Sequence, residues 1–165
     1  MASIKGPAQA PTTFPGADGL RIGIVHARWN KEVIDALVKG ALESLEKAGV
    51  PMANVIVDSV PGSWELPMGT QHVLSAHQVD AVIGIGCVIK GSTMHFEYIC
   101  ENALQGLMRV GLDAKLPVIL GVLTALNDDQ ALERAGLGRH GKAGHNHGVD
   151  WGFAAVEMAL KMRKK

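Results

Sequence analysis

Four short apolar runs alternate along this chain with longer segments in which apolar residues recur every three or four positions. The runs, at residues 21–26, 55–60, 81–88 and 118–123, are rich in β-branched residues and almost unbroken. Unbroken apolar runs of this length are typical of strands in a parallel sheet that is covered on both faces. The sequence therefore predicts four central strands.

The segments between and after these runs predict amphipathic helices. Asn30 is a candidate N-cap for the first helix, and Asn127 with Gln130 resembles a capping box at the start of the fourth. The five expected helices carry the stripe from Val33 to Leu45, residues 64–75, the stripe from Phe96 to Val110, the segment after Asn127, and the stripe from Trp151 to Met162. This order implies right-handed crossovers and a three-layer α/β/α sandwich, flavodoxin-like, around a central parallel four-stranded sheet.

One domain accounts for the length of the chain. Its 165 residues suffice for a hydrophobic core, and 47% of them are apolar. Residues 1–19 are rich in Pro, Ala, Thr and Gly and lack the apolar core of a secretory signal. We therefore expect a flexible arm at residues 1–19 and a single domain at residues 20–165.

Charge and cysteine content narrow the function classes. Lys plus Arg and Asp plus Glu number 16 each, which gives no electrostatic reason to expect nucleic acid or an anionic membrane as a partner. No apolar run approaches the length of a membrane span. Cys87 and Cys100 form neither a metal-type nor a redox-type pair, so we expect free thiols in a reducing compartment and a cytoplasmic protein.

Polar and aromatic residues gather immediately after each expected strand. The segments are HARWN at 26–30, PGSWE at 61–65, KGSTMH at 90–95 and TALN at 124–127. The carboxyl ends of parallel strands meet at one edge of a sheet, and ligands of such sheets bind there. We therefore expect the functional site at that edge.

The segment GIGCVIKGSTMHFEY at residues 84–98 excludes two nucleotide-binding motifs. It lacks the third glycine of a dinucleotide-binding fingerprint, and Ser92 stands where the phosphate loop of nucleotide hydrolases requires lysine. What remains is Gly91-Ser92-Thr93 before a helix, where free amides and two hydroxyls either bind a phosphate or cap the helix. Lys90 beside them favours an anion.

Four further side chains could serve chemistry or structure. His95 follows the candidate phosphate site and is the residue type that exchanges protons most readily near neutral pH, although a lone histidine is often structural. Trp29 and Trp64 either stack on a planar heterocycle or plug the sheet edge. Glu65 either accepts hydrogen bonds from hydroxyl groups or interacts with a helix dipole.

The C-terminal third offers cations and histidines. Arg134 and the basic, glycine-rich segment 138–148 suit an anion, including one bound on a neighbouring subunit. His145 and His147 are weak indications of a metal site, because no cysteine and no clear carboxylate ligand accompanies them.

These motifs, in this order, resemble the lumazine synthase family, in particular its fungal branch. The matching stretches span residues 21–162 almost completely: RIGIVHARWN, SVPGSWELP, VIGIGCVIKGSTMHFEY, PVILGVLTALNDDQALERAG and GHNHGVDWGFAAVEMAL. Five separated motifs in register are far more specific than any one of them.

The resemblance implies a role for each matching residue, with His95 as the proton-transferring histidine. Residues that would contact the pyrimidine and its ribityl chain are Trp29, Asn30, Ser63, Trp64, Glu65, Ile89, Lys90 and Leu120. Residues that would bind phosphate are Gly91, Ser92, Thr93, Arg134 and His147, with Arg134 reaching it from the adjacent subunit.

Two features depart from the common family pattern. Many members have asparagine-lysine-glycine where this chain has Asn146-His147-Gly148, so a cation that titrates replaces a fixed one. Residues 137–145, between the RAG and NHG motifs, form a longer segment than in the members that build hollow shells. The family assembles as homopentamers with active sites at subunit interfaces, and the longer segment favours a free pentamer. The resemblance also allows the arm to add a strand to a neighbouring subunit.

The implied activity is the penultimate step of riboflavin biosynthesis. It condenses 5-amino-6-(D-ribitylamino)uracil with 3,4-dihydroxy-2-butanone 4-phosphate to 6,7-dimethyl-8-ribityllumazine, with no cofactor and no metal, and riboflavin or phosphate could also occupy the site. Two alternatives remain. The chain could be a non-catalytic riboflavin-binding oligomer, or a shell protein whose function is assembly itself.

Overall fold

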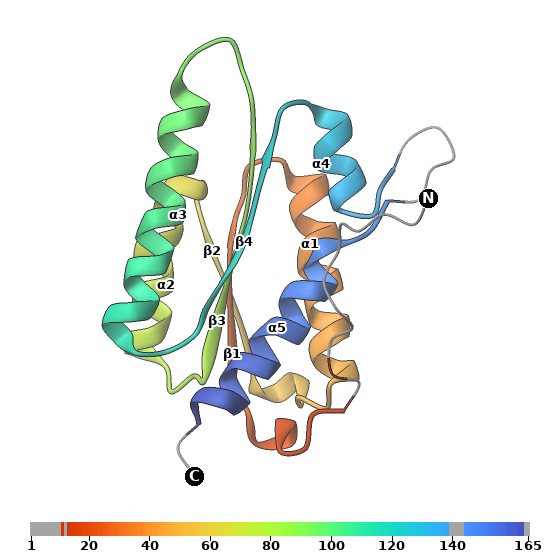
Figure 1. The fold of residues 1–165 in the computed structure, drawn as a ribbon, viewed down its shortest axis with the longest axis vertical. Coiled ribbons are helices and arrows are strands. Elements are labelled where there is room, and N and C mark those ends of the chain that lie inside the picture. The colour runs from red at the N-terminus through yellow and green to blue at the C-terminus, as the bar shows by residue number, and fades with distance from the viewer. Residues whose placement is uncertain (1–10, 12, 139–143, 164–165) are drawn as a thin grey trace.

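A sheet of four parallel strands lies between two layers of helices in the computed structural model, which describes residues 11, 13–138 and 144–163 (Figure 1). The strand order is β2-β1-β3-β4, and all three pairings are parallel. The strands are β1 (Ile22–Ala27), β2 (Val55–Val60), β3 (Ala81–Ile89) and β4 (Val118–Ala125). The predicted α/β/α sandwich around a four-stranded parallel sheet is confirmed.

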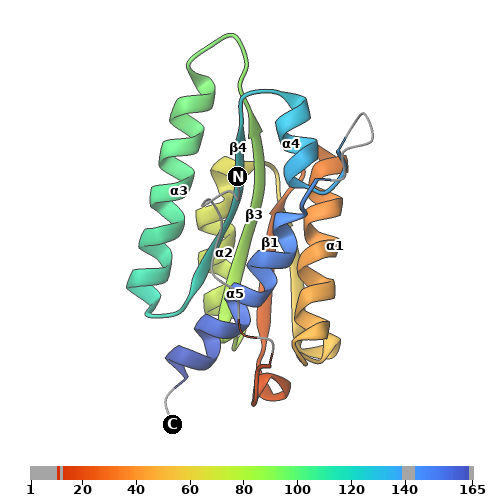
Figure 2. The ribbon, with the colours of Figure 1, turned by 45° about the vertical axis from the view of Figure 1, so that its right-hand side comes forward.

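The described residues also form five α-helices and three short 3-10 helices, which precede, connect or follow these strands. The α-helices are α1 (Lys31–Lys47), α2 (Leu66–Ala76), α3 (His95–Ala114), α4 (Asp128–Arg134) and α5 (His147–Met162), and the 3-10 helices are η1 (Ala17–Gly19), η2 (Met52–Asn54) and η3 (Ser63–Glu65). Figure 2 shows α2 and α3 on one face of the sheet and α1 and α5 on the other. Within the described residues, none of these helices has the length and apolar character needed to cross a bilayer.

Alternating strand residues divide the interior into two cores. Ile24 and Ile83 belong to the core under α1 and α5, whereas Val25 and Val82 belong to the core under α2 and α3. This is the two-residue period of a strand whose faces are both covered. Because each face is packed, sliding a strand by one residue would place its side chains in the wrong core, so packing fixes the register.

The last two strands extend further than the apolar runs predicted. The ladder between β3 and β4 continues through Val88↔Thr124 and Ile89↔Ala125. Backbone pairing does not require an apolar side chain, so the strand passes through Thr124 without a break. The extension carries the chain to the edge where Lys90 and Leu126 begin the next loops.

Of two predicted helix starts, one agrees with the structure and the other differs from it. Asn127 caps α4 as expected, with its Oδ1 accepting from the amide of Gln130 at 3.0 Å. In contrast, α5 begins at His147, one turn before the apolar stripe, because the Asn146 side chain accepts from the amide of Gly148 at 2.8 Å. His147, which belongs to the basic, glycine-rich segment, therefore lies in the first turn of α5, ahead of the predicted apolar stripe.

The described part of the N-terminal segment packs on the domain. Phe14 stacks on Phe153 of α5 with ring centroids 5.8 Å apart, and Ala17 is buried. Residues 1–10 and 12 lie outside the described residues, so a flexible arm and its boundary at residue 19 stay predictions.

Helices α1 and α5 approach each other too closely for a side chain at Gly152. A Cβ built there would lie 1.9 Å from the Oγ of Ser44 and 2.7 Å from the carbonyl oxygen of Ala41. Ser44 cannot easily move away, because it is buried and donates to that same carbonyl.

We expect Gly152→Ala to lower the free energy of unfolding by about 1–3 kcal/mol, the usual cost of overpacking. Chemical denaturation measures this, with Glu157→Ala on the exposed side of α5 as a control that stays within about 0.5 kcal/mol. A Gly152→Ala protein as stable as the parent would mean that α1 and α5 do not pack as described.

Candidate active site

A cavity of about 610 Å³ opens at the carboxyl edge of the sheet, beside the β1–β3 pair. The chain leaves β1 for β2 on one side and returns to β3 on the other. This is the switch point at which ligands bind in open α/β sheets. Seven of the predicted site residues line the cavity: Trp29, Asn30, Ser63, Trp64, Glu65, Ile89 and His95.

Trp29 lines the cavity and packs against the turn at Gly62. Its side chain is 71% exposed, so an apolar ring of this size is available to a ligand. A Cβ at Gly62 would lie 3.3 Å from Cδ1 of Trp29, and the Oε2 of Glu65 accepts from the Gly62 amide at 2.9 Å. Glu65 thus holds the turn that supports the indole, which is a structural role in addition to any contact with hydroxyl groups.

Asn30 does not cap α1 with its side chain, contrary to the prediction. Its backbone is left-handed, with φ 58° and ψ 51°, and its Nδ2 donates to the carbonyl oxygen of Cys87 at 3.0 Å. The helix still begins at Lys31, since the Asn30 carbonyl accepts from the amide of Ile34. The side chain instead joins the end of β1 to β3 at the cavity wall.

Ser63 and Trp64 begin the 3-10 helix after β2. Ser63 is buried against Gly86 of β3, where an added Cβ would lie 2.6 Å from the Ser63 Oγ. Trp64 is 56% exposed and lies between this cavity and a second groove along α2 and α3. The site and that groove therefore share one indole.

His95 is the first residue of α3 and faces the cavity from the helix start. Its amide donates to the Thr93 hydroxyl at 3.4 Å, so Thr93 acts as a weak local cap. Gly91, Ser92 and Thr93 are exposed beside the cavity, and a Cβ at Gly91 would meet no atom within 4 Å. Both sequence alternatives, a helix cap and an open anion site, are compatible with this loop.

Lys90 pairs with Glu97 across that loop. The hydrogen bond from Lys90 lowers the pKa of the Glu97 carboxyl, which therefore stays ionised at neutral pH. The Lys90 amide donates to the carbonyl oxygen of Ala125 at 2.9 Å, which ties the loop to the end of β4.

Seven predicted residues are not among the described residues that line the cavity. Four of them, Lys90, Gly91, Ser92 and Thr93, form the loop that leads to His95, and the other three, Leu120, Arg134 and His147, lie on other elements. Leu120 lies on β4 and is 46% exposed, and Arg134 ends α4, with its Nη1 3.7 Å from the exposed Glu133.

A carboxylate accompanies the two histidines, which the sequence analysis missed. Asp150 Oδ2 lies 2.6 Å from Nε2 of His145 and 3.8 Å from Nδ1 of His147. The start of α5 at His147 brings Asp150 one helical turn away. Even so, no three His, Cys, Asp or Glu side chains within the described ranges are placed to hold a metal ion. Burial lowers the pKa of His147, and Asp150 only partly offsets this.

Cys87 and Ile99 also line the cavity and were missed. Burial is the main cause that raises the pKa of the Cys87 thiol to about 11, so this wall is a neutral thiol. Ile99 follows His95 by four residues and thus lies on the same face of α3. That helical spacing was the available signal for Ile99, whereas none marked Cys87.

Comparison with known proteins gives a consistent result. The model of the family described as 6,7-dimethyl-8-ribityllumazine synthase matches residues 19–163. A protein of that name from Schizosaccharomyces pombe is 59% identical over 162 residues, covering 98% of each chain. Proteins of the same name from Pyricularia oryzae and Porphyromonas gingivalis are each 45% identical, covering 96% and 89% of this chain and 94% and 88% of their own. This chain belongs to the 6,7-dimethyl-8-ribityllumazine synthase family.

Proposed function

We propose that this chain catalyses the condensation of 5-amino-6-(D-ribitylamino)uracil with 3,4-dihydroxy-2-butanone 4-phosphate to 6,7-dimethyl-8-ribityllumazine. The observation that carries the proposal is a single cavity lined by an exposed indole, Trp29, and an imidazole, His95. Its volume suits a heterocycle with a short side chain. Membership of the family supplies the reaction class.

In this proposal the pyrimidine ring stacks on Trp29. Glu65 accepts a hydrogen bond from the Gly62 amide and so fixes the turn at Gly62. This turn packs closely against the Trp29 indole and thereby restrains its orientation. The ribityl hydroxyls are placed near the Oε1 of Glu65, because Oε2 already accepts from the Gly62 amide. Holding both substrates in one cavity supplies much of the acceleration, because the attacking amine is already nucleophilic.

The chemistry consists of proton transfers that one histidine can serve. The pyrimidine amine attacks the ketone and the carbinolamine loses water to give an imine. Removal of the C3 proton then expels phosphate from C4 by β-elimination, and the resulting enol takes up a proton at C4 to become a second carbonyl at C3. Attack of the ribityl-bearing nitrogen on this carbonyl closes the ring with loss of another water. His95 takes and returns these protons at the cavity wall.

Phosphate binding in this proposal combines two subunits. The exposed amides and hydroxyls of Gly91, Ser92 and Thr93 belong to one protomer, whereas Arg134 and His147 lie away from that protomer's cavity. A guanidinium from a neighbour would complete the anion site with a fixed charge that forms paired hydrogen bonds.

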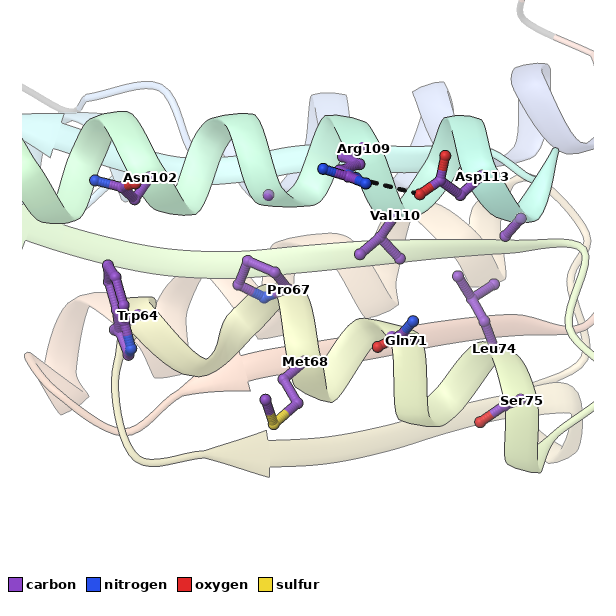
Figure 3. A pocket seen from close by; sticks show the side chains of 12 residues that line it. Trp64, Pro67, Met68, Gln71, Leu74, Ser75, Asn102, Arg109, Val110 and Asp113 are labelled. Atoms are coloured by element: carbon purple, nitrogen blue, oxygen red, sulfur yellow. Dashed lines mark hydrogen bonds and ion pairs between the residues drawn. The ribbon is translucent and has the colours of Figure 1, made fainter.

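A homopentamer is the assembly that we propose, by resemblance to the family. The groove of about 700 Å³ between α2 and α3 supports association, and Figure 3 shows Pro67, Met68, Leu74 and Val110 among the side chains that line it. Met68 is 76% exposed, and Met108 and Leu112 of α3 are also exposed. Apolar faces of this extent are typical of interfaces.

The outer edge of β2 supports a second contact between subunits. β2 is the first strand of the sheet order and pairs only with β1 among the described strands, and Val57 in it is 47% exposed. Open strand edges are usually covered. We propose that the N-terminal arm of a neighbour adds a strand there.

A cytoplasmic location is part of the same proposal. It rests on the two free thiols, Cys87 and Cys100, which suit a reducing compartment. Binding of riboflavin on the Trp29 indole is compatible with this function, because the flavin is also a flat ring with a ribityl chain. Formation of product distinguishes an enzyme from a binding protein.

Replacing His95 by alanine should lower kcat by about 100-fold or more, because general acid–base catalysis typically contributes that much. The Michaelis constants should stay within about threefold, since stacking and phosphate contacts remain. Fluorescence of the lumazine product, followed together with phosphate release, measures both. His72→Ala, on the exposed face of α2, is the control, and a His95→Ala enzyme with full kcat would exclude this histidine from proton transfer.

Replacing Arg134 by alanine should raise KM for the phosphorylated ketone by roughly 10- to 100-fold, since hydrogen bonds to charged groups are the strong ones. KM for the pyrimidine should change little. Lys39→Ala, which removes an exposed cation of α1, controls for the loss of charge alone. Unchanged use of the ketone by Arg134→Ala would refute the assigned role.

Replacing Met68 by aspartate should dissociate the assembly, because an unpaired charge would be buried in the groove. Light scattering coupled to size exclusion should show a smaller species, and turnover should fall because each site lacks its neighbour. Met162→Asp makes the same change at the end of α5, where Met162 is 49% exposed. If Met68→Asp kept both mass and activity, the α2–α3 groove would not be the interface.

A further inference from the structure

The ion pair between Lys90 and Glu97 spans the candidate phosphate loop from end to end. Lys90 is the first residue after β3, and Glu97 is the third residue of α3. Only residues 91–94 and the helix start lie between them. The pair therefore closes the base of the loop that carries Ser92, Thr93 and His95.

This pair is better shielded than the other lysine and arginine ion pairs in the described ranges. The side chains of Lys90 and Glu97 are 32% and 39% exposed, whereas those of Lys31 and Asp35 are 80% and 57% exposed. Exposed pairs contribute little, because water and salt screen them. Partial burial makes the Lys90–Glu97 contact less screened and its geometry better defined.

Three contacts hold Lys90 in place. Its amide donates to the Ala125 carbonyl at 2.9 Å, its Nζ pairs with Glu97, and the same Nζ lies 5.7 Å from the centroid of the Phe96 ring. The ammonium group is thus folded back over the first turn of α3. Its charge is balanced there and does not point freely at an anion.

The loop itself has few other restraints. Ser92 is exposed, and a Cβ added to Gly91 would meet no atom within 4 Å. Among the described residues, the Thr93 hydroxyl accepts one long hydrogen bond, from the His95 amide at 3.4 Å. A loop of this kind is ordered mainly by its two ends. The ionised state of Glu97 keeps the contact intact at neutral pH, since the hydrogen bond from Lys90 lowers the pKa of that carboxyl.

We propose that Glu97 is a positioning residue. Its ion pair with Lys90, called the clasp below, joins the two ends of residues 91–94 and so fixes the position of the phosphate loop and of His95 at the cavity. The inference rests on the proposed function, because it assigns a role in binding the phosphorylated ketone. Glu97 touches neither substrate in this proposal. It acts through Lys90 and the loop.

If the clasp orders the loop, neutralising Glu97 should change the affinity for the phosphorylated ketone in the opposite direction to a simple charge effect. Removing a negative charge near an anion site would by itself strengthen anion binding. Loss of the clasp should weaken it, because the loop must then be ordered by the substrate. Glu97→Gln should therefore raise KM for the phosphorylated ketone by roughly 5- to 10-fold, since it loses a charged hydrogen bond. KM for the pyrimidine should stay within about twofold.

A double-mutant cycle tests the pairing itself. Lys90→Met, Glu97→Gln and the double variant should show similar KM values for the ketone, because each breaks the same contact. Glu101→Gln is the matched control one turn further along α3, where the exposed Glu101 contacts only Gln105 among the described residues. Circular dichroism and light scattering establish that each variant keeps the fold and the assembly. Should Glu97→Gln not fold, Glu97→Asp shortens the side chain by one methylene and weakens the contact while it keeps the charge.

The outcomes separate this inference from the proposed function. A parent protein that forms no lumazine from the two substrates refutes the function. A parent that turns over normally while Glu97→Gln leaves KM for the ketone unchanged or lowered overturns the clasp, as do additive effects in the cycle. A raised KM for the ketone alone, without additivity, supports it.

Discussion

The parallel pairing of β1 with β3 is the constraint on which the site depends. Its register sets His26 beside Ile85, so the chain leaves both strands at the same edge, with Trp29 beyond one and Lys90 beyond the other. Because the chain goes from β1 outward to β2 and returns on the other side, this edge stays open to a ligand. Both faces of the pair are packed, and a one-residue shift would exchange the residues of the two cores. Packing of the interior thus determines the position of the cavity.

The periodicity of apolar residues was enough to predict the layers, the strands and the edge that carries the site, since these follow from burial alone. Details set by contacts between distant residues were not predictable. The local sequence predicts that the Asn30 side chain caps a helix, but its Nδ2 donates instead to the carbonyl oxygen of Cys87, 57 residues away. The start of α5 depends on Asn146, whose amide also donates to the Ala36 carbonyl of α1, 110 residues away. Seven candidate residues line one cavity because they lie at the end of a strand or soon after one, whereas Arg134 and His147 lie at the far end of α4 and at the start of α5.

An incomplete site and an open surface lead to the same conclusion about assembly. The cavity contains an indole that could stack on a heterocycle and a histidine that could transfer protons, but the described residues that line it include no arginine. At the same time Trp64 belongs both to the cavity and to the apolar groove between α2 and α3. A neighbour docked in that groove would therefore lie next to the site. In the proposed pentamer, covering apolar surface and completing the anion site are consequences of one association.

In the proposed function, the balance of charge at the site decides which residues bind the phosphate. Lys90 is matched by Glu97, so the loop residues 91–93 contribute amides and hydroxyls and little net charge. His147 stands where many family members have lysine, and burial lowers its pKa, with Asp150 opposing that effect and His145 and Arg134 adding to it. It is therefore a neutral hydrogen-bonding group at neutral pH, and it gains a charge only as the solution becomes acidic. In the proposed function Arg134 is the fixed cation for the dianionic phosphate, since a guanidinium stays charged at neutral pH. If that arginine comes from a neighbour, as proposed, recognition of the phosphate at neutral pH requires assembly, because the described residues that line the cavity include no lysine and no arginine.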